Sequence, residues 1–121
     1  MLVGHNVVRV VRTGPLIARR VQDFAIDLVM GTQPGSSGAH PLAEKYIRYG
    51  SSPRGAQALV ECGRVLALMQ GRVNLSLDDI RTVAPAVLRH RIILNFDAHA
   101  DGQTPDTILT KIVFSATAAA S

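Results

Sequence analysis

The sequence places a fixed positive charge at the expected start of a helix, in the segment Gly-Ser-Ser-Pro-Arg-Gly of residues 50–55. The Ser52 hydroxyl is predicted to cap this helix, because a serine at that position accepts a hydrogen bond from a free first-turn amide. Pro53 would take the first helical position, where its missing N–H costs nothing. Arg54 would then leave the first turn beside the positive end of the helix dipole, an arrangement suited to a phosphate. An ordinary capped helix with a solvated arginine is the alternative.

Other residues with catalytic potential do not form a self-sufficient active site in the sequence. The four histidines are far apart and fit no metal-ligand spacing such as H-E-x-x-H. Asp97, His99 and Asp101 alternate and could in principle bind a metal, but a polar loop is the simpler interpretation. No G-x-x-x-x-G-K-[ST] phosphate loop occurs in these residues. We therefore expect no metal site and do not expect the chain to be an enzyme by itself.

Length and composition indicate one helical domain. A chain of 121 residues can bury a core without disulfides or metal. Only 4% of its residues are aromatic, so the core must consist of aliphatic side chains, a composition that favours helices. The net charge of +4 is compatible with an anionic partner, whether nucleotide, nucleic acid or acidic protein. Because the basic residues are spread along the chain, we expect no specific binding of nucleic acid.

The sequence also carries expectations about location. It lacks an apolar run near the roughly 20 residues that span a bilayer. Its first residues do not resemble a secretion signal. Cys62 is the one cysteine, and we expect it to be buried and unreactive within a helix. These features predict a cytoplasmic protein without a membrane span.

Apolar residues at helical spacing predict an all-α fold, a small bundle of about four helices joined by short extended connectors. The first helix is expected over residues 15–31, with Gly31 as its stop, and the second over residues 53–70, with Gly71 as its stop. The third begins with a capping box at Ser76 and acidic residues in its first turn. Pro85 lacks an amide hydrogen and is expected to break or kink this helix near Ala84.

The remaining segments are predicted to be connectors and one last helix. Residues 7–11 would form a strand or linker, and residues 31–49 a long connection with a short helical turn and an extended approach to Gly50. Residues 92–94 are expected to be extended and buried, and residues 97–104 to form a polar loop. The last helix is predicted to begin at Thr104 and to fray after Ala116.

Four short motifs follow one another at fixed order along the chain: YGSSPRGA at residues 49–56, LMQGR at 68–72, VNLSLDDI at 73–80 and VLRHRI at 87–92. The series resembles the C-terminal lid domain of MoxR-type AAA+ ATPases. In that family G-[AS]-S-P-R, A-x-x-x-G-R, V-x-x-x-D-[IV] and V-L-x-H-R-[IL] appear in this order. The resemblance extends over roughly residues 7–115.

The resemblance implies a role for the Arg54 segment. Residues 1–13 would be a linker or the end of the connection from the ATPase core, and residues 14–121 would form a single lid domain, the core itself being absent. Arg54 would be the sensor 2 arginine, which reaches the γ-phosphate of ATP bound by the core, while Ser52 and Pro53 hold its origin firmly. ATP and Mg²⁺ would be bound by the full-length protein, and neither is expected on this part alone.

The resemblance also implies partners. The lid would work with its own AAA+ core in a homo-oligomeric ring, expected to be a hexamer. Such a ring would use ATP hydrolysis, in a chaperone-like way, to remodel or mature partner proteins, among them proteins with von Willebrand factor A domains.

Several neighbouring residues keep two interpretations each. Residues 89–91 (Arg-His-Arg) match the family's motif and would either dock the lid or form salt bridges within the bundle. Tyr46, Ile47 and Tyr49 would either approach the nucleotide base or the core, or pack under the lid. Arg72 is expected to be solvated beyond a helix stop. Residues 32–33 (Thr-Gln) depart from the Thr-Arg that relatives often carry.

Two other functions stay open at this point. A free-standing basic helical module could bind an acidic protein or nucleic acid, in which case its affinity for DNA would fall steeply with salt. A small metal enzyme could use the loop from Asp97 to Asp101, and divalent ions would then raise its melting temperature.

Overall fold

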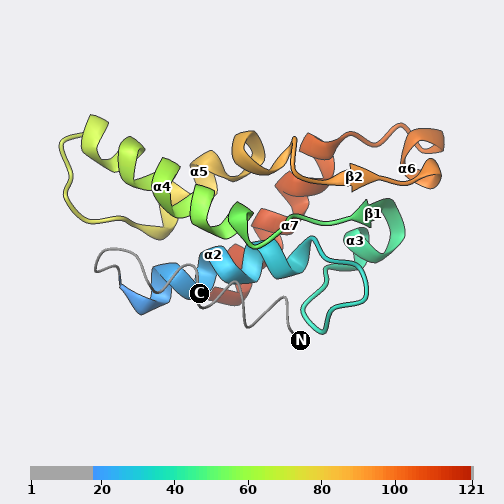
Figure 1. The fold of residues 1–121 in the computed structure, drawn as a ribbon, viewed down its shortest axis with the longest axis horizontal. Coiled ribbons are helices and arrows are strands. Elements are labelled where there is room, and N and C mark those ends of the chain that lie inside the picture. Colours follow the sequence, from blue (N-terminus) through green and yellow to red (C-terminus); the bar gives the residue numbers. More distant parts are fainter. Residues whose placement is uncertain (1–17, 121) are drawn as a thin grey trace.

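The structure is a computed structural model, which describes residues 18–120. Within this range it contains six helices and a two-stranded antiparallel sheet (Figure 1). The predicted strand or linker at residues 7–11 and the first residues of the first predicted helix lie outside the described range. The elements are α2 (Arg19–Gly31), α3 (Pro41–Tyr46), β1 (Ile47–Tyr49), α4 (Arg54–Met69), α5 (Leu77–Leu88), β2 (Ile93–Leu94), α6 (Phe96–Ala100) and α7 (Pro105–Ala120).

The four long helices form a bundle around an aliphatic core, which confirms the predicted all-α fold. Helix α4 packs against α5 and α2, and α7 packs against both α2 and α5. The short helices α3 and α6 lie with the small sheet at one end of the bundle (Figure 1). The largest fully buried apolar side chains come from all four long helices: Leu28, Leu59, Ile80, Leu88, Ile108 and Leu109.

The connection between α2 and α4 follows the prediction closely. His40 caps α3 by accepting a hydrogen bond at Nδ1 from the Leu42 amide, at 3.0 Å. After one short helix the chain becomes extended in β1 and pairs with β2, with Ile47 opposite Leu94. The long connection is therefore mostly structured, and it delivers the chain to Gly50 along a strand.

Helix ends, loops and the burial of single residues differ from the prediction; residues 92–94, for example, were expected to be buried, but Ile93 is 58% exposed. Gly31 is the last residue of α2 rather than a stop beyond it, and a Cβ there would lie 3.3 Å from Ile112 of α7. Residues 97–104 are not a polar loop throughout, because Asn95 accepts a hydrogen bond from the Ala98 amide and thereby starts α6. Helix α7 continues to Ala120, so the predicted fraying is absent from the described part. Cys62 is exposed, because it lies on the outer face of α4.

Pro85 does not break α5, which is continuous from Leu77 to Leu88. The proline lies in the last turn, so it removes one amide from the helix close to its end. Its neighbours Ala84 and Leu88 are buried, and the Arg89 amide donates to the Pro85 carbonyl at 3.0 Å. Burial of this apolar face outweighs the one missing hydrogen bond.

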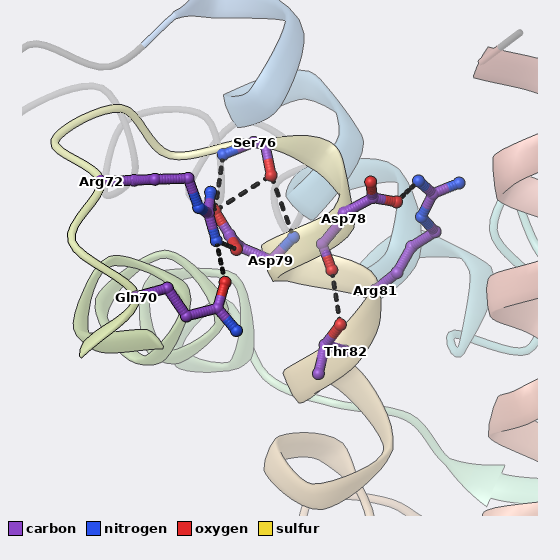
Figure 2. A network of polar contacts seen from close by, with 7 residues as sticks. All are labelled: Gln70, Arg72, Ser76, Asp78, Asp79, Arg81 and Thr82. Atoms are coloured by element: carbon purple, nitrogen blue, oxygen red, sulfur yellow. Dashed lines mark hydrogen bonds and ion pairs between the residues drawn. The ribbon is translucent and has the colours of Figure 1, made fainter. Parts of the chain in front are cut away.

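A buried carboxylate joins the end of α4 to the start of α5 (Figure 2). The predicted capping box is confirmed: the Asp79 amide donates to Ser76 Oγ at 3.3 Å, and Asp79 Oδ2 accepts from the Ser76 amide at 2.9 Å. The two carboxylate oxygens also accept from Arg72, at 2.9 Å and 2.5 Å. Arg72 is therefore an ion-pair partner of Asp79, which the prediction of a merely solvated arginine missed, while its side chain stays 40% exposed.

The pKa of the Asp79 carboxyl group is well below its ordinary value. Its side chain is only 2% exposed, and the hydrogen bond from Arg72 lowers its pKa from 3.8 to about 2, with further lowering by Ser76. Burial acts in the opposite direction but is outweighed. The charged form is thus favoured in the folded protein.

We predict that this carboxylate makes folding stability depend on acid. A group whose folded pKa is depressed stabilises the fold above its unfolded pKa, and this contribution is lost as the pH falls. In urea unfolding at pH 7, Asp79→Asn should lower the free energy of unfolding by about 2 kcal/mol, because the folded state loses the charged acceptor of the hydrogen bonds from Arg72 and Ser76. The difference from wild type should shrink between about pH 4 and pH 2.

The matched control is Asp97→Asn, which changes an exposed carboxylate and should alter stability by less than about 0.5 kcal/mol. A stability difference for Asp79→Asn that stays constant from pH 7 to pH 2 would show that the carboxylate charge is not what stabilises this junction.

Candidate functional site

The segment that precedes α4 is held by the end of α2. The Ser51 amide donates to Thr32 Oγ1 at 3.0 Å, and the Thr32 hydroxyl donates to the Val29 carbonyl at 2.7 Å. The Gln33 side-chain amide donates to the Ser51 carbonyl. Thr32 and Ser51 are both fully buried. Both backbone polar groups of Ser51 are therefore bound by α2 and the residues after it, and the chain is fixed three residues before Arg54.

Two glycines have no room for a side chain in this segment, Gly50 beside the end of α2 and Gly55 beside Ser51. A Cβ at Gly50 would lie 2.7 Å from the Thr32 carbonyl carbon and 2.9 Å from the Gln33 Cα. A Cβ at Gly55 would overlap the Ser51 hydroxyl and would lie 3.1 Å from the Ser51 Cβ. Gly50 and Gly55 do not have positive φ angles, so space rather than backbone conformation requires glycine at both positions.

The start of α4 corrects the predicted capping by Ser52. The Ser52 and Pro53 carbonyls accept from the Gly55 and Ala56 amides, at 2.9 Å and 3.1 Å, so the first turn is tight. The helix begins at Arg54, and Pro53 precedes it in a helical conformation. The Gly55 amide that the Ser52 hydroxyl would cap already has a partner. Within residues 18–120 this hydroxyl makes no hydrogen bond, and the Ser52 carbonyl accepts from the Ser51 hydroxyl at 3.0 Å.

Arg54 projects from this fixed start and is exposed to solvent. It lines an open hollow of about 450 Å³ together with Gln57, Ala58 and Glu61 of α4 and with Arg91, which follows α5. Arg54 and Arg91 form no salt bridge with the residues that the structure describes. Glu61 accepts a hydrogen bond from the Gln57 side chain at 3.3 Å. The hollow therefore presents two free guanidinium groups and one carboxylate.

The three residues of the motif Arg-His-Arg at 89–91 have different surroundings: the first forms an ion pair within the bundle, and the other two are exposed. Arg89 Nε lies 3.2 Å from Asp106 Oδ1 of α7, so for this residue the salt-bridge interpretation is correct. His90 is exposed, and Arg91 turns to the hollow beside Arg54. The sequence did not indicate that Arg91 and Arg54 share a surface, because the two residues are far apart in the chain.

The aromatic segment before the site serves mainly as core. Tyr46 is 5% and Ile47 2% exposed, so packing explains both, and neither can contact a nucleotide base in this conformation. The Tyr46 hydroxyl donates to Asp101 Oδ2 at 2.7 Å. Tyr49 alone of these three is largely exposed, at 57%.

The metal-site alternative finds no support in the geometry. Across residues 18–120, no group of three or more histidine, cysteine, aspartate or glutamate side chains could hold a metal ion. Asp101 is hydrogen-bonded to Tyr46 instead of pointing to a shared site with Asp97 and His99. The same described range contains no helix long and apolar enough to cross a membrane.

Sequence reasoning missed the residues that hold the site. Thr32 and Gln33 looked like a departure from a familiar motif, but they bind both backbone groups of Ser51. A signal was present in Gly50 and Gly55, since glycine is often used where a backbone must be approached closely.

The chain is similar in sequence to a known domain family and to several known proteins. Residues 40–112 match the family described as the AAA lid domain. The chain is 32% identical over 92 residues to Chaperone MoxR1 of Mycobacterium tuberculosis, covering 75% of this chain and 24% of that protein. It is 36% identical over 81 residues to Protein MoxR of Paracoccus denitrificans, covering 67% and 24%. The chain thus spans about a quarter of the length of these curated relatives.

A solved structure has the same fold. A crystal structure of a Cytophaga hutchinsonii protein assigned as an ATPase aligns with a TM-score of 0.72 and 31% identity. The alignment covers 90% of this chain and 32% of that one.

We predict that Gly50→Ala destabilises the protein by about 1–3 kcal/mol in urea unfolding, because the added methyl group meets the backbone of Thr32 and Gln33 and overpacks the junction. Gly38→Ala is the matched control, since a Cβ there makes an ordinary contact of 3.7 Å with Met30. Equal stability of the two variants would contradict the proposed tight approach at Gly50.

Proposed function

The chain belongs to the AAA lid domain family, and from this we propose that it serves as the C-terminal lid of a MoxR-type AAA+ ATPase. In this proposal residues 14–121 are the lid, and residues 1–13 are a linker or the end of the connection from the ATPase core. The core would bind ATP and Mg²⁺, and the lid would contribute Arg54 to the γ-phosphate. The relatives named MoxR and their similarity over most of this chain support the assignment.

The observation that carries the proposed sensor role is the combination of a fixed origin and a free charge at Arg54. Hydrogen bonds to the Ser51 amide and carbonyl fix the backbone just before the helix. The guanidinium itself is exposed and takes part in no ion pair within the described residues. A rigidly based arginine without an internal partner is suited to an anion supplied from outside the domain.

Arg54 would make the position of the lid depend on the nucleotide. A charge-assisted contact with the terminal phosphate exists while ATP is bound and is lost once that phosphate leaves. The lid would then shift relative to the core, and this movement is the means by which hydrolysis does mechanical work. Pro53 supports the role through its helical conformation, whereas Ser52 contributes its carbonyl rather than its hydroxyl.

The same assignment extends to partners. The lid would pack on its own AAA+ core in a homo-oligomeric ring, expected to be hexameric, in the cytoplasm. One relative is named a chaperone, which supports a role in remodelling or maturing other proteins. Proteins with von Willebrand factor A domains are the proposed clients.

We predict that Arg54→Ala in the full-length protein reduces the rate of ATP hydrolysis by about tenfold or more, since a hydrogen bond to a charged group contributes about 1.5–3 kcal/mol. Thermal unfolding should be nearly unchanged, because Arg54 is exposed and forms no salt bridge with a described residue.

Arg20→Ala provides the control. It also removes an exposed arginine, but one that lies on α2, and it should leave both stability and ATP turnover unaltered. ATP turnover by Arg54→Ala equal to that of the control would rule out the sensor role.

A further inference from the structure

We propose that Arg91 is a second phosphate-binding arginine, which acts together with Arg54 on one polyphosphate. The inference rests on the proposed function of Arg54 and adds to it a residue from a different element. Arg91 lines the same hollow as Arg54, although 36 positions separate the two residues in the sequence.

The backbone of Arg91 is held in a short turn at the end of α5. Its amide donates to the Leu88 carbonyl at 2.9 Å in the turn that ends α5. Leu88 and Ile92, which flank this turn, are buried in the core at 1% and 6% exposure. The exposed Arg91 side chain thus leaves a short turn that is anchored on both sides. Such an origin fixes the point from which the guanidinium reaches into the hollow, and a bound anion would then order the side chain.

The charges of the hollow favour an anion between the two arginines. Like charges that line one hollow repel each other, and an anion placed between them removes this repulsion. Glu61 is the one acidic side chain in the lining, and it is hydrogen-bonded to Gln57. The two arginines and Glu61 together give the lining a net charge of about +1, so the hollow attracts anions.

Other arginines of the bundle form ion pairs with carboxylates of the same domain. Arg72 binds the buried Asp79 through two nitrogens, and Arg89 forms a salt bridge with Asp106. Arg91 lies only two residues beyond Arg89 but turns to the hollow, where it has no such partner among residues 18–120. The structure therefore leaves Arg54 and Arg91 available for an external ligand.

A polyphosphate fits this pair better than a single carboxylate does. Each guanidinium presents a planar fork of donors that matches phosphate oxygens, and neighbouring phosphates can occupy two forks at once. Because a triphosphate carries more negative charge than a diphosphate, two arginines would increase the preference for ATP over ADP. A carboxylate of the ATPase core is the competing ligand for Arg91, and it would give no such preference.

The test uses the full-length protein and isothermal titration calorimetry with the non-hydrolysable ATP analogue AMP-PNP and with ADP. Arg91→Ala should weaken binding of the analogue about tenfold, the loss expected for one charge-assisted contact, and binding of ADP about threefold or less. Glu61→Gln should tighten binding of the analogue about two- to threefold by removing the opposing charge. Arg20→Ala again serves as the control for loss of an exposed arginine, and thermal unfolding confirms that each variant is folded.

The outcomes separate this inference from the function on which it rests. If Arg54→Ala weakens binding of the analogue while Arg91→Ala matches the control, the second arginine is refuted and the sensor role stands. If both variants match the control, the proposed function fails and the inference fails with it. Equal weakening of AMP-PNP and ADP by Arg91→Ala would assign this residue to docking on the core and would likewise overturn the inference.

Discussion

The buried hydrogen bond between the Ser51 amide and the Thr32 hydroxyl determines where the site lies. It joins the end of α2 to the chain that enters α4, and the two backbones approach so closely that Gly50 has no room for a side chain. Since Thr32 and Ser51 are fully buried, breaking this bond within the folded protein would leave polar groups unsatisfied. The direction of α4 and the origin of Arg54 follow from this one junction.

A second junction at the opposite end of α4 has the same character. Asp79 is almost completely buried, and its charge is compensated by Arg72 and by the capping box with Ser76. A buried charge is tolerated only where such partners are complete, so the link between α4 and α5 is geometrically specific. With both of its ends tied, α4 can carry an exposed arginine without losing the position of its first turn.

The fold could be predicted from the sequence wherever local patterns decide it. Apolar residues at helical spacing correctly predicted the long helices, and the capping box at Ser76 correctly identified the start of α5. The prediction failed where tertiary or turn geometry decides the outcome. The Ser52 hydroxyl does not cap α4, because the tight first turn already pairs the Gly55 amide, and Arg72 forms an ion pair with the buried Asp79 carboxylate. The pairing of Arg54 with Arg91 depends on how α4 and α5 pack, which no local pattern encodes.

This packing has a mechanical consequence under the proposed function. Arg54 lies at the start of α4 and Arg91 in the turn after α5, and these two helices pack in one core. A phosphate bound by both arginines would therefore be attached to the bundle as a whole. A ligand shifts a conformational equilibrium only as far as its affinity for the two states differs. If the arginines sat on flexible loops, they could follow the phosphate while the domain stayed in place, and the contact would move nothing. Because their backbones are fixed, losing the terminal phosphate would change the preferred position of the whole lid.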